Sequence, residues 1–172
     1  MVDVADTVPP AMDIDGNLVI WWVPTIADLA AVKVATEIGG AGSFRLTHSF
    51  TPGGFNFGGS QAKNPDERLA LLEILETLGK ITRSLSLEYV DSDDVKSAAV
   101  VLKPVAPAEN KSGYFVVRPM VSNKILATAA QKGYVIPVTV GKQLRPVTGT
   151  GKFLVMQETV ITGPVVDTVF AA

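Results

Sequence analysis

The chain has 172 residues, no cysteine, a single histidine and a formal net charge of −2 from 15 basic and 17 acidic side chains. The length fits one domain of ordinary size, and the missing cysteine excludes a disulfide framework, a thiolate nucleophile, a zinc–cysteine cluster and iron–sulfur ligation. The slight negative charge argues against tight wrapping of nucleic acid, which Lys and Arg drive by neutralising phosphates.

Hydrophobic residues make up 47% of the chain and charged residues only 19%. A lone small domain seldom needs so little charged surface, so we expect part of the exterior to be buried against other subunits. The acidic amino terminus lacks the basic stretch of a secretory signal. The longest apolar run, residues 18–23, is far shorter than the ~20 residues of a spanning helix, so we expect no membrane contact.

Most of the sequence is typical of β-strands. The candidate strands are rich in Val, Ile, Phe, Tyr or Thr and are bounded by Gly, Pro, Asn or Asp; they cover residues 18–23, 43–50, 80–90, 113–120, 133–140, 152–162 and 165–170. Short connections between such strands favour a sandwich or a barrel. We therefore predict a mainly β fold.

The first of these strands contains the consecutive residues Trp21 and Trp22. Successive side chains of a strand project to opposite faces. We therefore expect one indole in the core and the other at a contact between subunits.

Residues 51–64 carry the strongest loop signal in the chain. The stretch from Thr51 to Ser60 holds four glycines together with Phe55 and Phe57. Such a composition is too flexible to fold alone and tends to order on a partner. We expect a glycine-rich loop here whose two aromatic side chains are anchors.

Residues 66–78 allow two interpretations. Asn64 and Pro65 resemble the cap and first residue of a helix, which the leucines that follow could continue. The stretch 72–78 could equally be a strand that turns at Gly79 into the strand 80–90. Propensity alone favours the helix, and both interpretations stay open.

The strand 80–90 has the clearest alternation. Apolar positions 81, 85, 87 and 89 share one parity, with Arg83 as the exception, and the other parity is polar, formed by Thr82, Ser84, Ser86 and Glu88. A period of two predicts one buried and one wet face.

One helix is predicted, over about residues 94–103. Aspartates between 91 and 94 supply capping groups for its amino end. An apolar stripe follows at helical spacing, formed by Val95, Ala98, Ala99 and Leu102. Pro104 ends the segment.

Every catalytic or ligand-binding pattern that we tested fails. The Gly-Lys of residues 149–152 resembles a phosphate loop, but Phe153 replaces the required hydroxyl residue. Residues 39–42 lack the third glycine of a dinucleotide turn, and residues 13–17 lack ligands of a calcium loop. His48 could act as a catalytic base only beside a nucleophile, and the sequence has no nucleophile elbow such as Gly-x-Ser-x-Gly. We expect no enzyme activity, no cofactor and no metal site.

The order of features from residue 13 onward resembles one family. A Trp/Val strand ends in Trp-Val-Pro-Thr-Ile-Ala-Asp, and the segments that carry the likeness further are Ala35–Ile38, Pro65–Leu69, Ser84–Tyr89, the acidic helix start and Gly113–Arg118. The chain is similar to the major tail (tail tube) proteins of long-tailed, non-contractile, siphovirus-type phages of actinobacteria.

The resemblance implies a β-sandwich or barrel of the tail-tube type with one flanking α-helix, as a single domain over residues 1–172 without a C-terminal immunoglobulin-like domain. It implies a structural protein of the virion tail that assembles in the host cytoplasm as stacked hexameric rings. The hollow tube delivers viral DNA into the host. The implied partners are further copies of the chain, the tape measure, tail terminator and distal tail proteins, and passing double-stranded DNA that is not specifically bound.

The family's geometry admits DNA. If each of six copies contributes four strands, about 24 strands at ~4.8 Å spacing and ~40° tilt give a backbone diameter of ~48 Å. Side chains reduce this to a bore of ~38 Å, which is wide compared with the ~6–12 Å grooves of a duplex.

The resemblance also suggests where surfaces lie. A basic lining would bind the phosphates of passing DNA, so the polar parity of Thr82, Ser84, Ser86 and Glu88 is our candidate for the lumen. Phe55 and Phe57 are our candidates for an inter-ring contact. Two alternatives remain: a tube subunit of a contractile injection or secretion system, and a monomeric or dimeric β-sandwich binding or decoration module.

Overall fold

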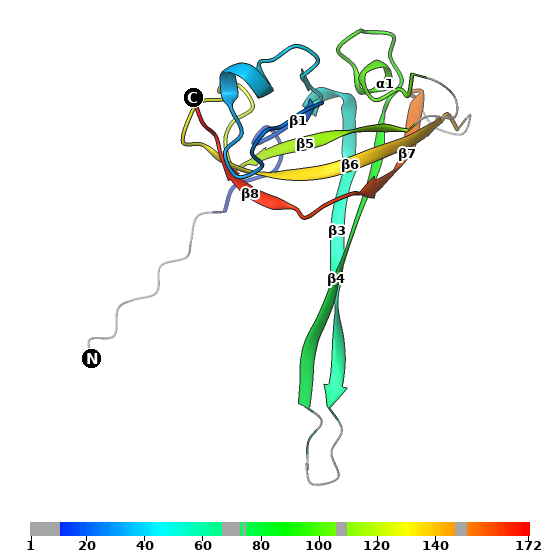
Figure 1. The fold of residues 1–172 in the computed structure, drawn as a ribbon. Helices are drawn as coiled ribbons and strands as arrows, with labels where there is room; N and C mark the ends of the chain where they lie inside the picture. Colours follow the sequence, from blue (N-terminus) through cyan, green and yellow to red (C-terminus); the bar gives the residue numbers. More distant parts are fainter. Residues whose placement is uncertain (1–10, 67–72, 74, 106–109, 147–150) are drawn as a thin grey trace.

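The computed structural model describes residues 11–66, 73, 75–105, 110–146 and 151–172. The elements in chain order are β1 (Leu18–Val23), a π-helical turn η1 (Val34–Ile38), β2 (Phe44–Arg45), a 3-10 turn η2 (Thr47–Ser49), β3 (Phe50–Asp66), β4 (Leu75–Val90), α1 (Ala98–Val101), β5 (Lys111–Pro119), β6 (Lys132–Leu144), β7 (Leu154–Ile161) and β8 (Val166–Val169). They form a body from which the β3–β4 hairpin extends far into solvent (Figure 1).

The fold is mainly β, as predicted. Seven strands are hydrogen-bonded in the order β2-β1-β5-β6-β7-β4-β3, and β8 pairs with β6. All these strand pairs are antiparallel. The strand β6 pairs with β8 through residues 132–135 and with β7 through residues 138–144. The strands β7 and β8 therefore follow one another along the same edge of β6.

The central strands carry a hydrophobic cluster on each face. Trp22 belongs to the first cluster, where its ring lies 5.2 Å from that of Phe115. Trp21 belongs to the second, with its ring 6.0 Å from that of Phe170. Both indoles are at least 94% buried inside the same subunit. The expected exposure of one tryptophan at a subunit contact was wrong, because the C-terminal segment covers the second face.

The predicted glycine-rich loop at 51–64 was wrong, since this stretch is the β-strand β3. Two of its glycines, Gly54 and Gly59, allow the backbone of β4 to approach closely. A Cβ on Gly54 would lie 2.1 Å from the carbonyl oxygen of Glu88, and one on Gly59 would lie 2.7 Å from that of Thr82. The register between Phe50 and Phe55 is shifted by an irregularity that includes Gly53, whose φ is +78°.

The open question over residues 66–78 is resolved in part. Leu75–Leu78 belong to the strand β4, which continues through Gly79 without a turn. Residues 67–72 and 74 lie outside the described residues, so the helix interpretation is not tested there. Asp66 and Leu75 are the outermost pair of the antiparallel β3–β4 ladder.

A helix flanks the sheet, but it is shorter than the predicted range of 94–103. It spans Ala98–Val101, and the Oγ of Ser97 accepts a hydrogen bond from the Val100 N–H at 3.4 Å. The carboxylate of Asp94 instead accepts from the Lys96 N–H at 2.8 Å, which stabilises a turn before the helix. The apolar stripe is correct at Ala98, Ala99 and Leu102, all of them buried, whereas Val95 is exposed.

Candidate assembly surfaces

The predicted alternation of β4 is confirmed within the body. Leu85, Leu87 and Tyr89 are at most 2% exposed, whereas Ser84 and Ser86 point to solvent on the opposite face. Beyond Arg83, both faces of the strand are exposed, so Thr82 and Ile81 lie on the projecting hairpin. The candidate lumen residues therefore form one row that runs from the body onto the hairpin.

This row belongs to a broader face that crosses four neighbouring strands, β5, β6, β7 and β4. The face is largely polar, but it also carries exposed Met156 opposite Glu88 and exposed Val160 opposite Thr139. Glu158 on β7 lies opposite Ser86. The hydroxyls of Ser112 on β5 and Thr139 on β6 are 2.8 Å apart. Glu88 accepts a 2.8 Å hydrogen bond from the hydroxyl of Thr51. The members of this face on β5, β6 and β7 could not be predicted from sequence, because their position depends on the strand register.

Phe55 and Phe57, the candidate inter-ring contacts, both pack inside their own subunit. The ring of Phe55 lies 5.4 Å from Phe50 and 5.3 Å from Phe115, and that of Phe57 stacks 6.0 Å from Tyr134. These contacts join the end strand β3 to β5 and β6, which closes the sheet around the first hydrophobic cluster. A contact of either ring with a neighbouring subunit stays a prediction.

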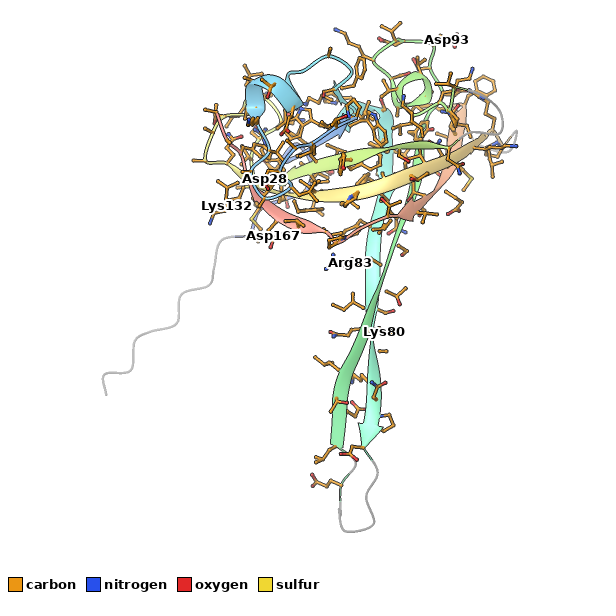
Figure 2. All side chains as sticks on the ribbon, viewed as in Figure 1. Asp28, Lys80, Arg83, Asp93, Lys132 and Asp167 are labelled. Carbon is orange, nitrogen blue, oxygen red and sulfur yellow. The ribbon has the colours of Figure 1, made fainter. Side chains whose placement is uncertain are left out.

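The hairpin beyond the body, residues 58–66 and 75–84, is here called the arm. Apart from Asp66 and Gly79, which are half-buried, its residues are exposed. Figure 2 shows Lys80 and Arg83 along it, outside the body. A two-stranded ribbon without cover is marginally stable in water. The arm is therefore our candidate for an assembly surface.

A β-bulge sets the two faces of the arm. Lys63 lies opposite Leu78 and Gln61 opposite Ile81, so the two residues between Leu78 and Ile81 oppose Ala62 alone. The extra residue places Leu78 and Ile81 on the same face. That face continues the one on which Phe57 packs into the body. Leu78 is 71% and Ile81 58% exposed.

Charge is unevenly distributed along the arm. Near the body it carries Lys80 and Arg83 (Figure 2). At the far end, Lys63 forms a 3.2 Å ion pair with Glu76. Asp66 ends β3 and Glu73 precedes β4, both at this end. Among the described residues, this end therefore carries three carboxylates and one lysine, which is paired with one of them.

A polar pocket lies at the opposite end of the same hairpin, beside α1. It has a volume of about 460 Å³, and its charged or titratable lining residues are Arg45, His48, Asp94, Lys96 and Lys152. Ser49 and Val90, which also line it, adjoin the Phe50–Tyr89 end of the β3–β4 ladder. Exposed Val95 and Phe153 neighbour two of its lysines in sequence. We call this surface the α1 end.

A buried polar network fixes α1 on the sheet. The side-chain amide of Gln157 donates to the carbonyls of Leu102 at 3.2 Å and Gly141 at 2.6 Å. That of Gln143 donates to the Ala99 carbonyl at 2.8 Å and to the Tyr89 hydroxyl at 2.9 Å. Burial raises the pKa of Tyr89 far above its ordinary value. Hydrogen bonds from β6 and β7 therefore fix the position of the helix α1 at this end of the molecule.

The tested ligand patterns form ordinary local structure where they are described. Residues 13–17 form a turn in which the Asn17 N–H donates to the Ile14 carbonyl at 3.0 Å. His48 is exposed in η2 beside the pocket. Among the described residues, we find neither a helix long and apolar enough to cross a bilayer nor a cluster of His, Asp and Glu suited to a metal ion.

Comparisons with known proteins agree with this architecture. Residues 5–172 match the family described as phage tail tube protein. No curated protein matches the sequence. A chain in a solved structure, the cryo-EM structure of the anti-feeding prophage baseplate, 6-fold symmetrised, has a similar fold with a TM-score of 0.55 and 9% identity, over 94% of this chain and 97% of that one. Since the family match covers nearly the whole chain, the protein belongs to the phage tail tube protein family, whose members are structural components of the virion tail.

Proposed function

We propose that the chain is the repeating subunit of the tail tube, assembled as stacked hexameric rings around a channel for viral DNA. Family membership supports a structural role. The observation that carries the proposal is the arm, which leaves Leu78 and Ile81 more than half exposed on a ribbon that a lone subunit does not cover. Identical neighbours would bury these side chains and pair exposed strand edges.

We assign the polar face around Ser84, Ser86 and Glu88 to the lumen. It crosses four adjacent strands, as a continuous inner barrel of about 24 strands requires. Glu158, opposite Ser86, adds a second carboxylate to the face beside Glu88. Carboxylates and hydroxyls repel or weakly contact DNA phosphates, so the duplex slides instead of binding.

Microscopy of the purified protein at high concentration tests the proposal. We expect hollow tubes with a bore of ~38 Å, the diameter estimated for about 24 strands, and light scattering that grows with concentration. A small particle of constant size, with or without the other tail proteins, would instead favour a binding or decoration module.

A cysteine variant tests the lumen assignment, because the native chain has no cysteine to compete. Ser86→Cys should react with a small maleimide in both free subunits and tubes. A polymer maleimide wider than the bore should label free subunits only. Equal labelling of tubes by the large reagent would place this face outside the channel.

A second candidate is a tube subunit of a contractile injection or secretion system. The fold similarity to a chain of the anti-feeding prophage baseplate favours it. Ring and lumen would be the same in both machines. A sheath gene next to the gene for this protein would support the contractile alternative, and its absence the non-contractile, siphovirus-type tail that injects DNA.

A further inference from the structure

We propose that the polar pocket at the α1 end is a binding site for a phosphate dianion, either inorganic phosphate or the phosphate group of a phosphomonoester. The cationic groups of the site are the side chains of Arg45, Lys96 and Lys152, and the hydroxyls of Ser49 and Ser92 are additional donors. All of these residues belong to one subunit. The site is therefore independent of the proposed tube function.

The pocket has the size and the net charge that such a ligand requires. Its volume of about 460 Å³ lies within the ~300–1,000 Å³ that is typical of small-molecule sites. Apart from Val90, every lining residue is polar or charged. With His48 neutral, three cations and the carboxylate of Asp94 leave two positive charges, in a protein whose formal net charge is −2. A doubly charged anion neutralises this excess.

The carboxylates at this end of the molecule are engaged elsewhere or lie outside the pocket. The Oδ1 of Asp94 accepts a hydrogen bond from the Lys96 N–H at 2.8 Å. Asp91 is paired with Arg145, whose Nε lies 2.8 Å from the carboxylate. Asp93 does not line the pocket and lies at the outer margin of the α1 end (Figure 2). The cations of the pocket therefore keep their attraction for an external anion.

Arg45 contributes positive charge that has no counter-ion within the described part of the chain. Its Nη2 donates to the carbonyl of Asn123, and Arg118 donates to the adjacent carbonyls of Ser122 at 3.2 Å and Ile125 at 2.8 Å. Among the described residues, neither guanidinium is paired with a carboxylate, and the buried Nε of each lacks a hydrogen-bond partner. Two unpaired guanidiniums that converge on one loop create a positive potential, which an anion beside Arg45 stabilises.

Serine hydroxyls add neutral donors in fixed positions. The Oγ of Ser49 accepts a hydrogen bond from the Ala98 N–H at 3.1 Å, and that of Ser92 accepts from the Asp94 N–H at 3.3 Å. Each bond occupies a lone pair and leaves the hydroxyl proton for a ligand. The hydroxyl of Ser97 instead donates to the Ser92 carbonyl at 2.9 Å. Phosphate oxygens accept several such bonds at once, most strongly from charged donors.

The walls of the pocket are held by the fold. Arg45 lies in β2, where it is paired with Trp21 of β1. On the other side, the bonds from Gln143 and Gln157 to carbonyls of α1 and of Leu102 fix the helix next to Ser97. A site that is already ordered loses little conformational freedom when the ligand binds.

Other hollows of the molecule do not fit a dianion. The groove beside β8 has a volume of about 640 Å³, and its two charged lining residues, Lys132 and Asp167, balance each other (Figure 2). A hollow on the arm of about 320 Å³ has Arg83 as its one charged lining residue. The pocket at the α1 end differs from both, because several cations and hydroxyls line it together.

Calorimetric titration of free subunits with inorganic phosphate tests the site, near pH ~8, where phosphate is a dianion. We expect saturation of one site per subunit. Lys96→Gln with Lys152→Gln should weaken binding by about tenfold or more, because two of the three cations are lost. Lys80→Gln with Lys132→Gln is the matched control, which removes the same charge outside the pocket (Figure 2). At constant ionic strength the control should change the Kd by less than about twofold.

A second pair of variants separates charge from fold. Lys96→Arg with Lys152→Arg keeps both charges and should bind phosphate within about threefold of the native protein. Circular dichroism first shows that every variant folds as the native chain does. Phosphate should also raise the melting temperature of the native protein and leave that of Lys96→Gln with Lys152→Gln nearly unchanged, since a ligand that binds only the folded state stabilises it.

The remaining titrations distinguish the sources of the phosphate group. Tighter binding of glycerol phosphate than of inorganic phosphate would identify a phosphomonoester as the ligand, and the reverse order would identify inorganic phosphate. Saturation by a short DNA duplex but not by phosphate would overturn the proposal in favour of a nucleic-acid contact. Equal weakening in the pocket variant and the control would also overturn it, because attraction would then follow net charge alone. Neither result would affect the proposed tube function, since only free subunits are titrated.

Discussion

The hydroxyl of Tyr89 donates a 2.7 Å hydrogen bond to the Oε1 of Gln157, and both side chains are fully or almost fully buried. The amide nitrogen of Gln157 is bonded in turn to the carbonyls of Leu102 and Gly141. One glutamine thus bonds to three groups, the Tyr89 hydroxyl and the carbonyls of Leu102 and Gly141. This network attaches the helix α1 to the same sheet whose strands β3 and β4 extend into the arm.

We expect Gln157→Leu to lower the free energy of unfolding by about 2–4 kcal/mol. The substitution preserves much of the side-chain volume but removes the donor to the Leu102 and Gly141 carbonyls and leaves the Tyr89 hydroxyl with only its bond from Gln143. Urea unfolding followed by circular dichroism measures the loss. The control is Gln61→Leu, at an exposed position on the arm, which should change stability by less than about 0.5 kcal/mol. Equal effects at both sites would contradict the role of the network.

The same network predicts a dependence on pH. Burial raises the pKa of Tyr89 well above its ordinary value near ~10, so the unfolded chain releases this proton at a lower pH than the folded one. The stability from neutral Tyr89 is fully present below pH ~10 and is lost as the pH rises further, by about 1.4 kcal/mol per unit.

Tyr89→Phe isolates this contribution, because every other titrating group is shared with the native chain. The native protein should lose more unfolding free energy between pH ~9 and ~11 than the variant does. The measurement is the urea midpoint of both proteins at each pH. Parallel losses would mean that Tyr89 ionises as easily in the fold as in the unfolded chain.

The contacts of Phe55 and Phe57 inside their own subunit predict that removing either ring lowers folding stability, and not only assembly. Because both rings pack against the core of their own subunit, each substitution by alanine should cost about 2–4 kcal/mol of folding stability. Loss of tubes in these variants would then follow from the weakened subunit. Phe153→Ala, at a 79% exposed ring, is the control and should leave the melting temperature nearly unchanged. Native-like melting of Phe55→Ala would exclude the core role.

Several elements could be predicted from sequence because their pattern is local. The strand Leu18–Val23 has the predicted bounds, since a short apolar run ends there at Pro24. The alternation from Ser84 to Tyr89 also identified the correct wet face. These patterns depend only on which side chains a strand turns inward.

Other features depend on the partner strand and could not be predicted in this way. The pairing of Ala62 against both residues between Leu78 and Ile81 shifts the parity of β4 before Ile81. From Ile81 onward the predicted alternation is regular, but on the arm both of its faces are exposed. The glycines near Phe55 resemble a loop in composition, yet two of them, Gly54 and Gly59, are required because β4 carbonyls lie where a Cβ would be. The strand interpretation of residues 72–78 placed a turn at Gly79, whereas β4 continues through this glycine, so the long hairpin was not predicted.

Gly113 provides a final test of the packing that underlies the body. A Cβ at this position would lie 2.4 Å from Cζ2 and 2.7 Å from Cη2 of Trp22. The indole has no free space, because it is 1% exposed and packs edge-on against Phe115. Gly113→Ala should therefore cost about 1–3 kcal/mol through displacement of core rings.

Gly58→Ala is the matched control for Gly113→Ala. The new methyl group would meet nothing within 4 Å, and fewer conformations of the unfolded chain should make the change neutral or slightly stabilising, by up to about 1 kcal/mol. Thermal unfolding of both variants measures the contrast. A stable Gly113→Ala protein would mean that Trp22 has another position in the core. The packing of β5 against β3 would then also differ from the one described.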